Sequence, residues 1–255
     1  MKKKRAQITI FIIIAVLILI IGVSIFLIKQ PPKQKNIPAN IQPINSYVQE
    51  CIDETAIQAV FYISERGGYY NVPEKTIDKL TPYYLYEEEN YMPSKEKIQE
   101  QLSLYVNEKL NDCINDFTDF IDFEIQQDEI KTTTEIKASQ VLFNINYPLK
   151  ISRQGEVNNL EDFTTTVPIR LGIVYEAIDK IMQEQIKDTS ALDPNNIYEV
   201  SIQNDINVKM IGFIEDSVIF VTTDKNSKID NQDFIFVFAN KYVPTNPLEI
   251  QSQEE

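Results

Sequence analysis

Acidic side chains at helical spacing are the first residues of this chain that could do chemistry. Asp112 and Asp116 lie one helical turn apart, and a carboxylate pair can act as acid and base or hold a hard cation. A second candidate is the triplet Asp224, Asn226 and Asp230, whose alternate spacing is compatible with calcium ligation. It lacks the glycine and the distal glutamate of an EF-hand. Because neither set carries a signal of burial, we expect a solvated acidic patch and a plain hairpin loop.

Histidine is absent from the chain. Its absence excludes Ser-His-Asp and Cys-His nucleophile arrangements and all imidazole metal sites. Six glycines occur, and none of them forms a phosphate-binding loop. We therefore expect no catalytic activity, no cofactor and no metal, with an enzyme that uses carboxylates or a bound cation as an alternative.

Cys51 and Cys113 are the only cysteines. They form no C-x-x-C pair, so the sequence does not favour a thiolate metal site. In an oxidising compartment they can form a disulfide that closes a loop of about 60 residues. Each lies on or beside the apolar stripe of a predicted helix, so the bond would join a helical pair. We predict this disulfide; the alternative is two separate buried thiols.

Tyrosines and prolines dominate the segment that joins the two predicted helices. Long loops of this kind are often functional, and tyrosines can form a binding platform because they bury area while keeping a polar end in water. The same side chains could instead pin the loop onto the helices as a satellite core. Both interpretations stay open for the candidate binding loop, whose tyrosines are Tyr69, Tyr70, Tyr83, Tyr84, Tyr86 and Tyr91.

Two amphipathic helices are predicted in the first half of the chain. The first begins at Asn45-Ser46, where Ser46 and Gln49 match a capping box, and runs to Arg66 before a Gly-Gly pair. The second is capped by Ser94 and reaches about residue 115. Apolar residues at helical spacing give each helix one buried stripe.

From residue 119 onward the pattern changes to strands. Thr, Ile, Val and Phe alternate with polar residues in segments 122–127, 129–152 and 159–172, and a further helix follows up to about residue 187. A three-strand meander over 206–242 has apolar residues on both sides, which predicts a sheet covered on both faces. The expected fold class is α+β, with a helical pair, a mainly antiparallel sheet and one further helix behind a transmembrane helix.

An uncharged apolar stretch occupies Ile8–Ile28. At about 1.5 Å per residue it spans a hydrocarbon core of about 30 Å, so it reads as a membrane helix. A cleaved signal peptide would be shorter and followed by small residues, whereas Lys29-Gln30-Pro31-Pro32 follows here. Four basic residues precede the stretch, which favours a cytoplasmic N-terminus, an extracytoplasmic body and localisation as a single-pass protein of the cell membrane.

The predicted organisation has five parts, and prolines break the part after the membrane helix into a semi-rigid spacer. They are a basic N-terminus and transmembrane helix (1–29), a proline-rich linker (30–44), a helical pair with the tyrosine-rich loop (45–118), an α+β sheet region (119–243) and a disordered acidic tail (244–255).

Charge argues against a nucleic-acid partner. The net charge is −14, and only 17 of the 24 Lys and Arg lie after residue 35, whereas all 38 acidic residues do. Such a body repels phosphate backbones and anionic membrane surfaces. The expected partners are the lipid bilayer, through Ile8–Ile28, and other envelope proteins.

The N-terminal sequence "KKKRAQITIFIII" resembles the class III signal of archaeal type IV pilin-like proteins. The resemblance implies that a membrane peptidase cuts between Ala6 and Gln7, and that Ile8–Ile28 then serves as anchor and filament-packing surface. Phe11 stands where pilins usually carry glutamate.

The whole layout is also similar to single-span proteins of small-genome archaea that begin K/R-x-Q-[IV]-T-[IL]-F and carry an extracytoplasmic α+β body. That likeness implies no activity. In this chain it includes "NYPLKISRQGE", "VPIRLGIVYE" and "DFIFVFANKY".

These observations lead to three hypotheses. The favoured one is a membrane-anchored extracytoplasmic binding or structural module of the cell surface. The second is a type IV pilin-like subunit processed before Gln7, and the third is a carboxylate- or cation-dependent enzyme.

Overall fold

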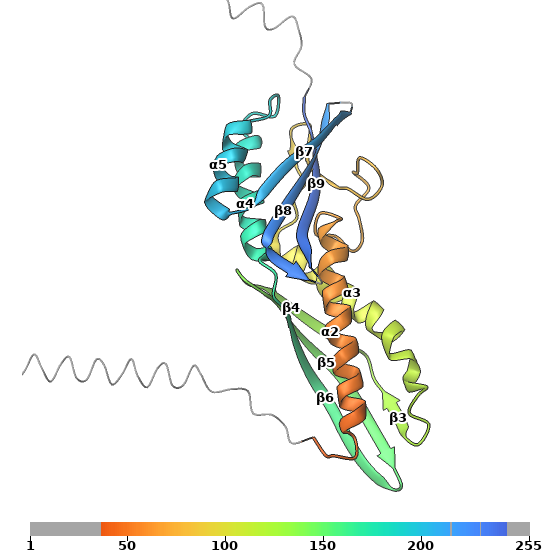
Figure 1. Cartoon of the computed structure of the whole chain (residues 1–255). Helices are drawn as coiled ribbons and strands as arrows, with labels where there is room; N and C mark the ends of the chain where they lie inside the picture. The colour runs from red at the N-terminus through yellow and green to blue at the C-terminus, as the bar shows by residue number, and fades with distance from the viewer. Residues whose placement is uncertain (1–36, 215, 230, 244–255) are drawn as a thin grey trace, which may run out of the picture. The chain divides into compact units, whose positions relative to one another are not determined.

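The computed structural model describes residues 37–214, 216–229 and 231–243, which form four α-helices and nine strands. The predicted α+β class is confirmed (Figure 1). The predicted membrane segment Ile8–Ile28, the processing site at Ala6 and Gln7 and the tail 244–255 lie outside the described residues. Within the described part, the helices are all too short or too polar to cross a membrane.

Helix α2 (Gln42–Ser64) begins three residues before the predicted start at Asn45. Ser46 does not cap it, because the helix has no side-chain cap. Pro43 lies in the first turn, where its missing N–H costs nothing. Ile41 and Ile44 are buried, so tertiary packing extends the helix into what was predicted as linker.

Helix α3 (Lys95–Ile114) begins as predicted, with the Ser94 side chain accepting a hydrogen bond from the Lys97 backbone N–H. It ends at Asn115, which has left-handed backbone angles, and a short 3-10 turn follows (Asn115–Phe117). α3 packs against α2, which confirms the helical pair. The predicted disulfide is present, with the Cα atoms of Cys51 and Cys113 5.6 Å apart.

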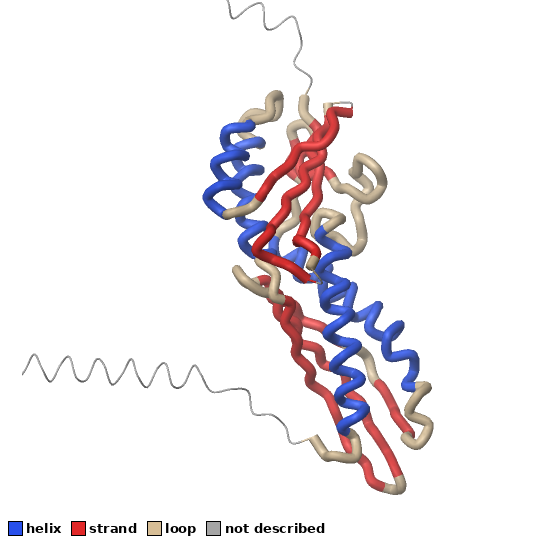
Figure 2. The backbone as a smooth tube through the Cα atoms, viewed as in Figure 1, coloured by secondary structure: helices blue, strands red, loops and turns tan. Residues whose placement is uncertain are grey.

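The first sheet lies against this pair (Figure 2). Its central strand β5 pairs with β6 along one edge, and with β4 and then β3 along the other. Alternate β5 residues are buried on the helix side, and those between them are exposed or half-buried. Gly155 makes the predicted turn between β5 and β6 with φ +88°. The strands are β3 (Glu124–Gln127), β4 (Lys131–Ile136), β5 (Val141–Arg153) and β6 (Glu156–Val167).

The second sheet has the strand order β2-β1-β9-β8-β7. Its strands are β1 (Tyr83–Tyr86), β2 (Glu89–Asn90), β7 (Asn207–Ile214), β8 (Ser217–Ile229) and β9 (Gln232–Lys241). All neighbours are antiparallel except β1 and β9, which are parallel. Antiparallel pairing therefore predominates as predicted, but there are two sheets where one was predicted, and the tyrosine-rich segment contributes the two strands β1 and β2.

The pairing of β1 with β9 joins segments on either side of the predicted boundary at residue 118. β1 belongs to the segment between α2 and α3, yet it lies inside the sheet that the C-terminal strands build. The described residues from Asn40 onward form one compact unit.

Two helices follow β6, where one was predicted. α4 (Leu171–Gln185) was expected, whereas α5 (Pro194–Asn204) falls in the predicted polar connection. Asp193 caps α5 by accepting from the backbone N–H groups of Asn195 and Asn196. Only two α5 residues are buried, so it has almost no apolar stripe for a pattern to reveal.

Strand β8 is longer than predicted. It continues to Ile229 through the segment expected to be a loop from Asp224, and its register with β9 shifts between Asp224 and Lys228. This part of the strand is polar and its ladder with β9 is irregular, so the sequence shows no alternation of apolar residues that would predict a strand.

The two faces of the second sheet differ in burial. Phe220, Phe236 and Phe238 are buried, and the ring of Phe238 stacks between those of Phe220 and Tyr84 at centroid distances of 4.9 and 4.6 Å. Further along β9, Asn240 contacts Met182 of α4, which places α4 over this face.

The opposite face, which we call the outer face, is only partly covered. Its large apolar side chains alternate with the buried phenylalanines and none of them is fully buried, whereas Ala239 on the same face is. The prediction that both faces are covered is therefore wrong for the outer face among the described residues. Its members are Ile211, Ile219, Val221, Ile235 and Val237.

Candidate functional site

The acidic residues of the α3 end do not converge on a site. The Asp112 carboxylate pairs with Lys109 at 3.2 Å, and Asp116 accepts a hydrogen bond from Gln127 at 3.0 Å. Both aspartates are exposed. Across the described ranges, no three Cys, Asp or Glu side chains are placed to hold a metal ion.

Asp224 is fully buried and bound to an arginine. Nε and Nη2 of Arg170 each donate to its carboxylate at 2.9 Å, and Ser227 Oγ donates at 2.6 Å. Arg170 Nη2 also donates to the backbone carbonyls of Asn204 and Asp205. Arg170 and Asp224 therefore hold the start of α4, the end of α5 and β8 together. Asp224 was expected in a plain hairpin loop, but its carboxylate stabilises the fold.

The pKa of Asp224 is set by two opposing effects. Burial by itself raises it, while the hydrogen bonds from Arg170, Ser227 and the Asn226 backbone N–H together bring it below its usual value of 3.8. Asp224 is thus held as a carboxylate inside the fold.

Two of the six predicted tyrosines belong to the core. Tyr84 is fully buried and its hydroxyl donates to the carbonyl of Gly67 at 2.9 Å. Burial raises the pKa of this hydroxyl. Tyr83 is nearly buried, with its hydroxyl 3.0 Å from Ser217 Oγ. For these two, the interpretation as a satellite core is the better one.

Tyr69 and Tyr70 fasten the loop that leaves α2. The ring of Tyr70 lies edge-on to those of Tyr62 and Tyr105, and its hydroxyl donates to Glu108 at 2.7 Å. This hydrogen bond, helped by burial, raises the pKa of Tyr70 to about 12. Tyr69 donates to the carbonyl of Tyr91 at 3.4 Å. Both contacts attach the loop to neighbouring segments and do not form a binding site.

Tyr86 and Tyr91 are different, because their rings lie against the same charged group at the surface. The ammonium group of Lys75 lies 4.6 Å from the ring centre of Tyr86 and 4.1 Å from that of Tyr91. Lys75 donates to the Tyr91 hydroxyl, which in turn donates to Glu89. These bonds raise the pKa of Lys75 and lower the pKa of Glu89, so both groups stay charged.

A second lysine lies over the same tyrosine ring. Lys241 Nζ is 5.0 Å from the ring centre of Tyr86 and 3.6 Å from the carboxylate of Glu87. The tight turn between β1 and β2 presents the acidic residues, with Glu87 at φ +59°. We call the resulting cavity of about 540 Å³ the hairpin pocket; it is lined by Lys75, Tyr86, Glu87, Glu88, Glu89 and Val243.

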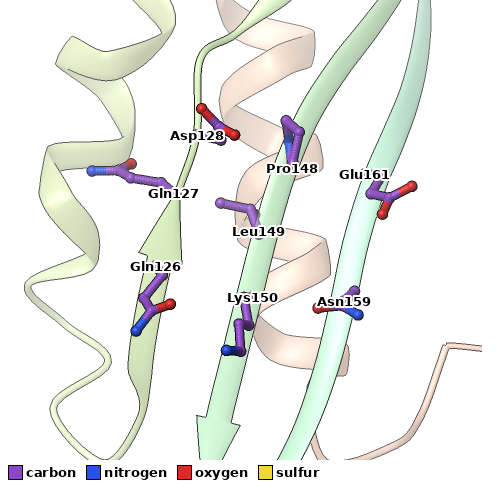
Figure 3. A pocket seen from close by; sticks show the side chains of 8 residues that line it. All are labelled: Gln126, Gln127, Asp128, Pro148, Leu149, Lys150, Asn159 and Glu161. Atoms are coloured by element: carbon purple, nitrogen blue, oxygen red, sulfur yellow. The ribbon is translucent and has the colours of Figure 1, made fainter.

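A further pocket lies on the exposed face of the first sheet (Figure 3). It has a volume of about 290 Å³ and occurs where β5 bulges between Asn146 and Leu149. Amides and charged groups from three strands line it, but alternating polar residues are what any solvated sheet face shows, so no sequence signal marked it. Its lining residues are Gln126, Gln127, Asp128, Pro148, Leu149, Lys150, Asn159 and Glu161.

Comparison with protein-family models, with curated proteins and with solved structures found no match for this chain. The interpretation of the hairpin pocket therefore depends on its own geometry. The Tyr86 ring, the Lys75 ammonium group and the carboxylates of Glu87, Glu88 and Glu89 line this pocket, so it can bind a ligand that carries charge.

Proposed function

We propose that this protein is an extracytoplasmic binding module of the cell surface, anchored by Ile8–Ile28, and that the hairpin pocket is its binding site. The location is supported by the Cys51–Cys113 disulfide, since disulfides form and persist in oxidising compartments. The net charge of −14 disfavours nucleic acid, so we propose another envelope protein as the partner.

The arrangement around Tyr86 carries the binding proposal. Tyr83 and Tyr84 of the same strand are buried, whereas Tyr86 is half-buried and its ring lies beside the ammonium groups of Lys75 and Lys241. The ion pair of Lys75 is solvent-exposed and that of Lys241 is partly so, and exposed pairs contribute only about 0–1 kcal/mol. A charged segment of a partner can therefore replace them at little cost.

The location is tested by protease protection on intact cells, with and without reductant. We expect external protease to degrade the body faster after reduction, since the disulfide no longer restrains α2 and α3. A body that resists protease until the cells are lysed would contradict an extracytoplasmic location.

The binding site is tested by placing a photo-crosslinking residue at Glu88, inside the hairpin pocket, in the full chain in its own membrane. The matched control position is Val157, which is exposed on the first sheet. We expect a crosslinked product at Glu88 that disappears in a Tyr86→Ala background and does not form at Val157. Equal crosslinking at the two positions, or a product that survives Tyr86→Ala, would reject the pocket as the site.

A further inference from the structure

Exposed apolar side chains gather on α5 and β7. Of the eight large apolar residues that are exposed in the described part of the chain, four lie on these two elements. Tyr198 and Ile202 are 68% and 61% exposed and share one face of α5, since they are four residues apart. Met210 and Ile211 of β7 are 39% and 52% exposed and point to opposite sides of the sheet.

β7 is also an edge strand. Among the described strands it pairs only with β8, so its outward N–H and C=O groups have no ladder partner. Natural edges are usually blocked by proline, by several charges or by a bulge. β7 has one charged residue, Lys209, and its bulge comes only at Gly212 with φ +67°. The stretch before Gly212 keeps a regular ladder.

We infer that β7 is an interface between two copies of this chain, in which the two β7 strands pair antiparallel around Met210. An antiparallel pair of identical edges is self-complementary by a two-fold axis. It also extends both exposed rows at once: Met210 meets Met210 of the second copy on the α5 side, and Ile211 continues the outer face across the junction. A single sheet then runs through both copies.

Side-chain chemistry selects this register. Facing residues of an antiparallel pair share a face of the sheet, and like charges directly opposite are destabilising. Pairing centred on Lys209 would set two lysines against each other. Pairing centred on Val208 would set Ile211 opposite residue 205, which precedes β7, so no strand residue of the second copy would cover Ile211. Pairing centred on Met210 sets Lys209 opposite Ile211, where the lysine stem can cover the isoleucine.

The interface is small, so the two copies should associate only weakly at low concentration. A standard stable interface buries about 800 Å² per partner, which a short strand pair with four apolar side chains does not approach. Copies held in one membrane meet at a higher effective concentration, an effect that rests on the proposed anchor. Because each copy carries a charge of −14, added salt should strengthen association by screening the repulsion.

The test uses the full chain in detergent micelles and in vesicles, with Met210→Cys as the probe. The native cysteines are already bonded to each other, so they do not compete. Under mild oxidation we expect a symmetric disulfide-linked dimer, formed more readily in vesicles and at higher salt. Val157→Cys, on an exposed strand of the other sheet, should stay monomeric.

A second variant separates association from folding. Met210→Lys puts two like charges opposite each other. We expect its dimer fraction, measured by sedimentation, to be about tenfold lower than that of the native chain, with an unchanged circular dichroism spectrum. The proposal is overturned if Met210→Cys crosslinks no faster than Val157→Cys, if it links to a different protein instead of to itself, or if Met210→Lys leaves the dimer fraction unchanged.

Discussion

Single buried polar residues tie distant segments of this chain together. Besides Asp224, the clearest example is Asn240, whose side-chain oxygen accepts from the backbone N–H of Leu85 at 3.1 Å. At this point the ladder between β1 and β9 is irregular, and the amide replaces a missing backbone partner. A buried donor left without a partner costs about 1–3 kcal/mol, so such residues hold their strands in register.

Arg170→Met should destabilise the protein strongly, because it leaves Asp224 buried without its cation. Removing one partner of a buried ion pair typically costs about 3–5 kcal/mol, and Asp224 has no exposed side-chain surface. Urea unfolding measures the loss. The matched control is Lys109→Met, which breaks an exposed pair and should cost less than about 1 kcal/mol. Equal effects of the two substitutions would contradict the structural role.

The same carboxylate predicts a dependence of stability on pH. Its pKa in the folded protein is lower than its usual value of 3.8, so the stabilisation is fully present above that value and is lost as the pH falls through the folded-state pKa. We therefore expect the free energy of unfolding to fall as the pH drops below about 3.8. Asp224→Asn should flatten this part of the curve; an unchanged slope would assign the acid sensitivity to other groups.

At the scale of elements, the α2–α3 pair depends on its disulfide. In the chain-entropy model a bond that closes a loop of this length stabilises the fold by about 4 kcal/mol. The double variant Cys51→Ser/Cys113→Ser should lose up to this amount in urea unfolding, yet stay folded because apolar side chains of both helices remain buried together. Reduction of the native protein should give a similar loss. A double variant as stable as the oxidised protein would contradict this role.

A helix or strand could be predicted from the sequence when its own residues determine where it begins and ends. α3 was predicted well because Ser94 caps it and its apolar residues repeat at helical spacing. α2 was predicted to start late because the burial of Ile41 and Ile44, not a cap, sets its beginning. β1 was missed because its main partner, β9, lies about 155 residues away in the chain, and no local pattern reports such a pairing.

The candidate site was only partly visible for the same reason. All six tyrosines of the segment were identified, but the roles of the three on β1 depend on the face that each occupies. The surroundings of Tyr86 also depend on Lys75, eleven residues before it, and on Lys241 at the end of β9. The disulfide was predictable because each cysteine lies on or near the apolar stripe of a well-defined helix. The ion pair between Asp224 and Arg170 could not be predicted from the sequence, because it depends on how α4 and β8 are placed relative to each other.

At the scale of the whole described unit, the segment that contains β1 connects α2 and α3, which pack on the first sheet, to the second sheet, so we expect one cooperative fold. Tyr84→Ala should therefore destabilise both sheets together by about 3–5 kcal/mol, the usual cost of deleting a buried aromatic ring. We expect far-ultraviolet circular dichroism and hydrogen exchange in β5 and β8 to report one transition. Two separate transitions would instead support independent units divided near residue 118.

The N-terminus separates the anchored module from the pilin-like alternative. The proposed anchor predicts an intact chain that begins at Met1, or at Lys2 after removal of the first methionine. Mass spectrometry of the protein purified from its own membrane measures this directly. A mature chain that begins at Gln7 would favour the pilin-like subunit instead.

The parallel pairing of β1 with β9 also affects how the protein is made. A ribosome adds about 5–20 residues per second, so β1 waits about 10–30 s for a partner strand some 155 residues downstream. During that interval Tyr84 and Leu85, which end fully buried, remain exposed to water. We expect a nascent chain stopped at residue 230 to be cut readily by protease near β1, and the completed chain to resist cleavage there.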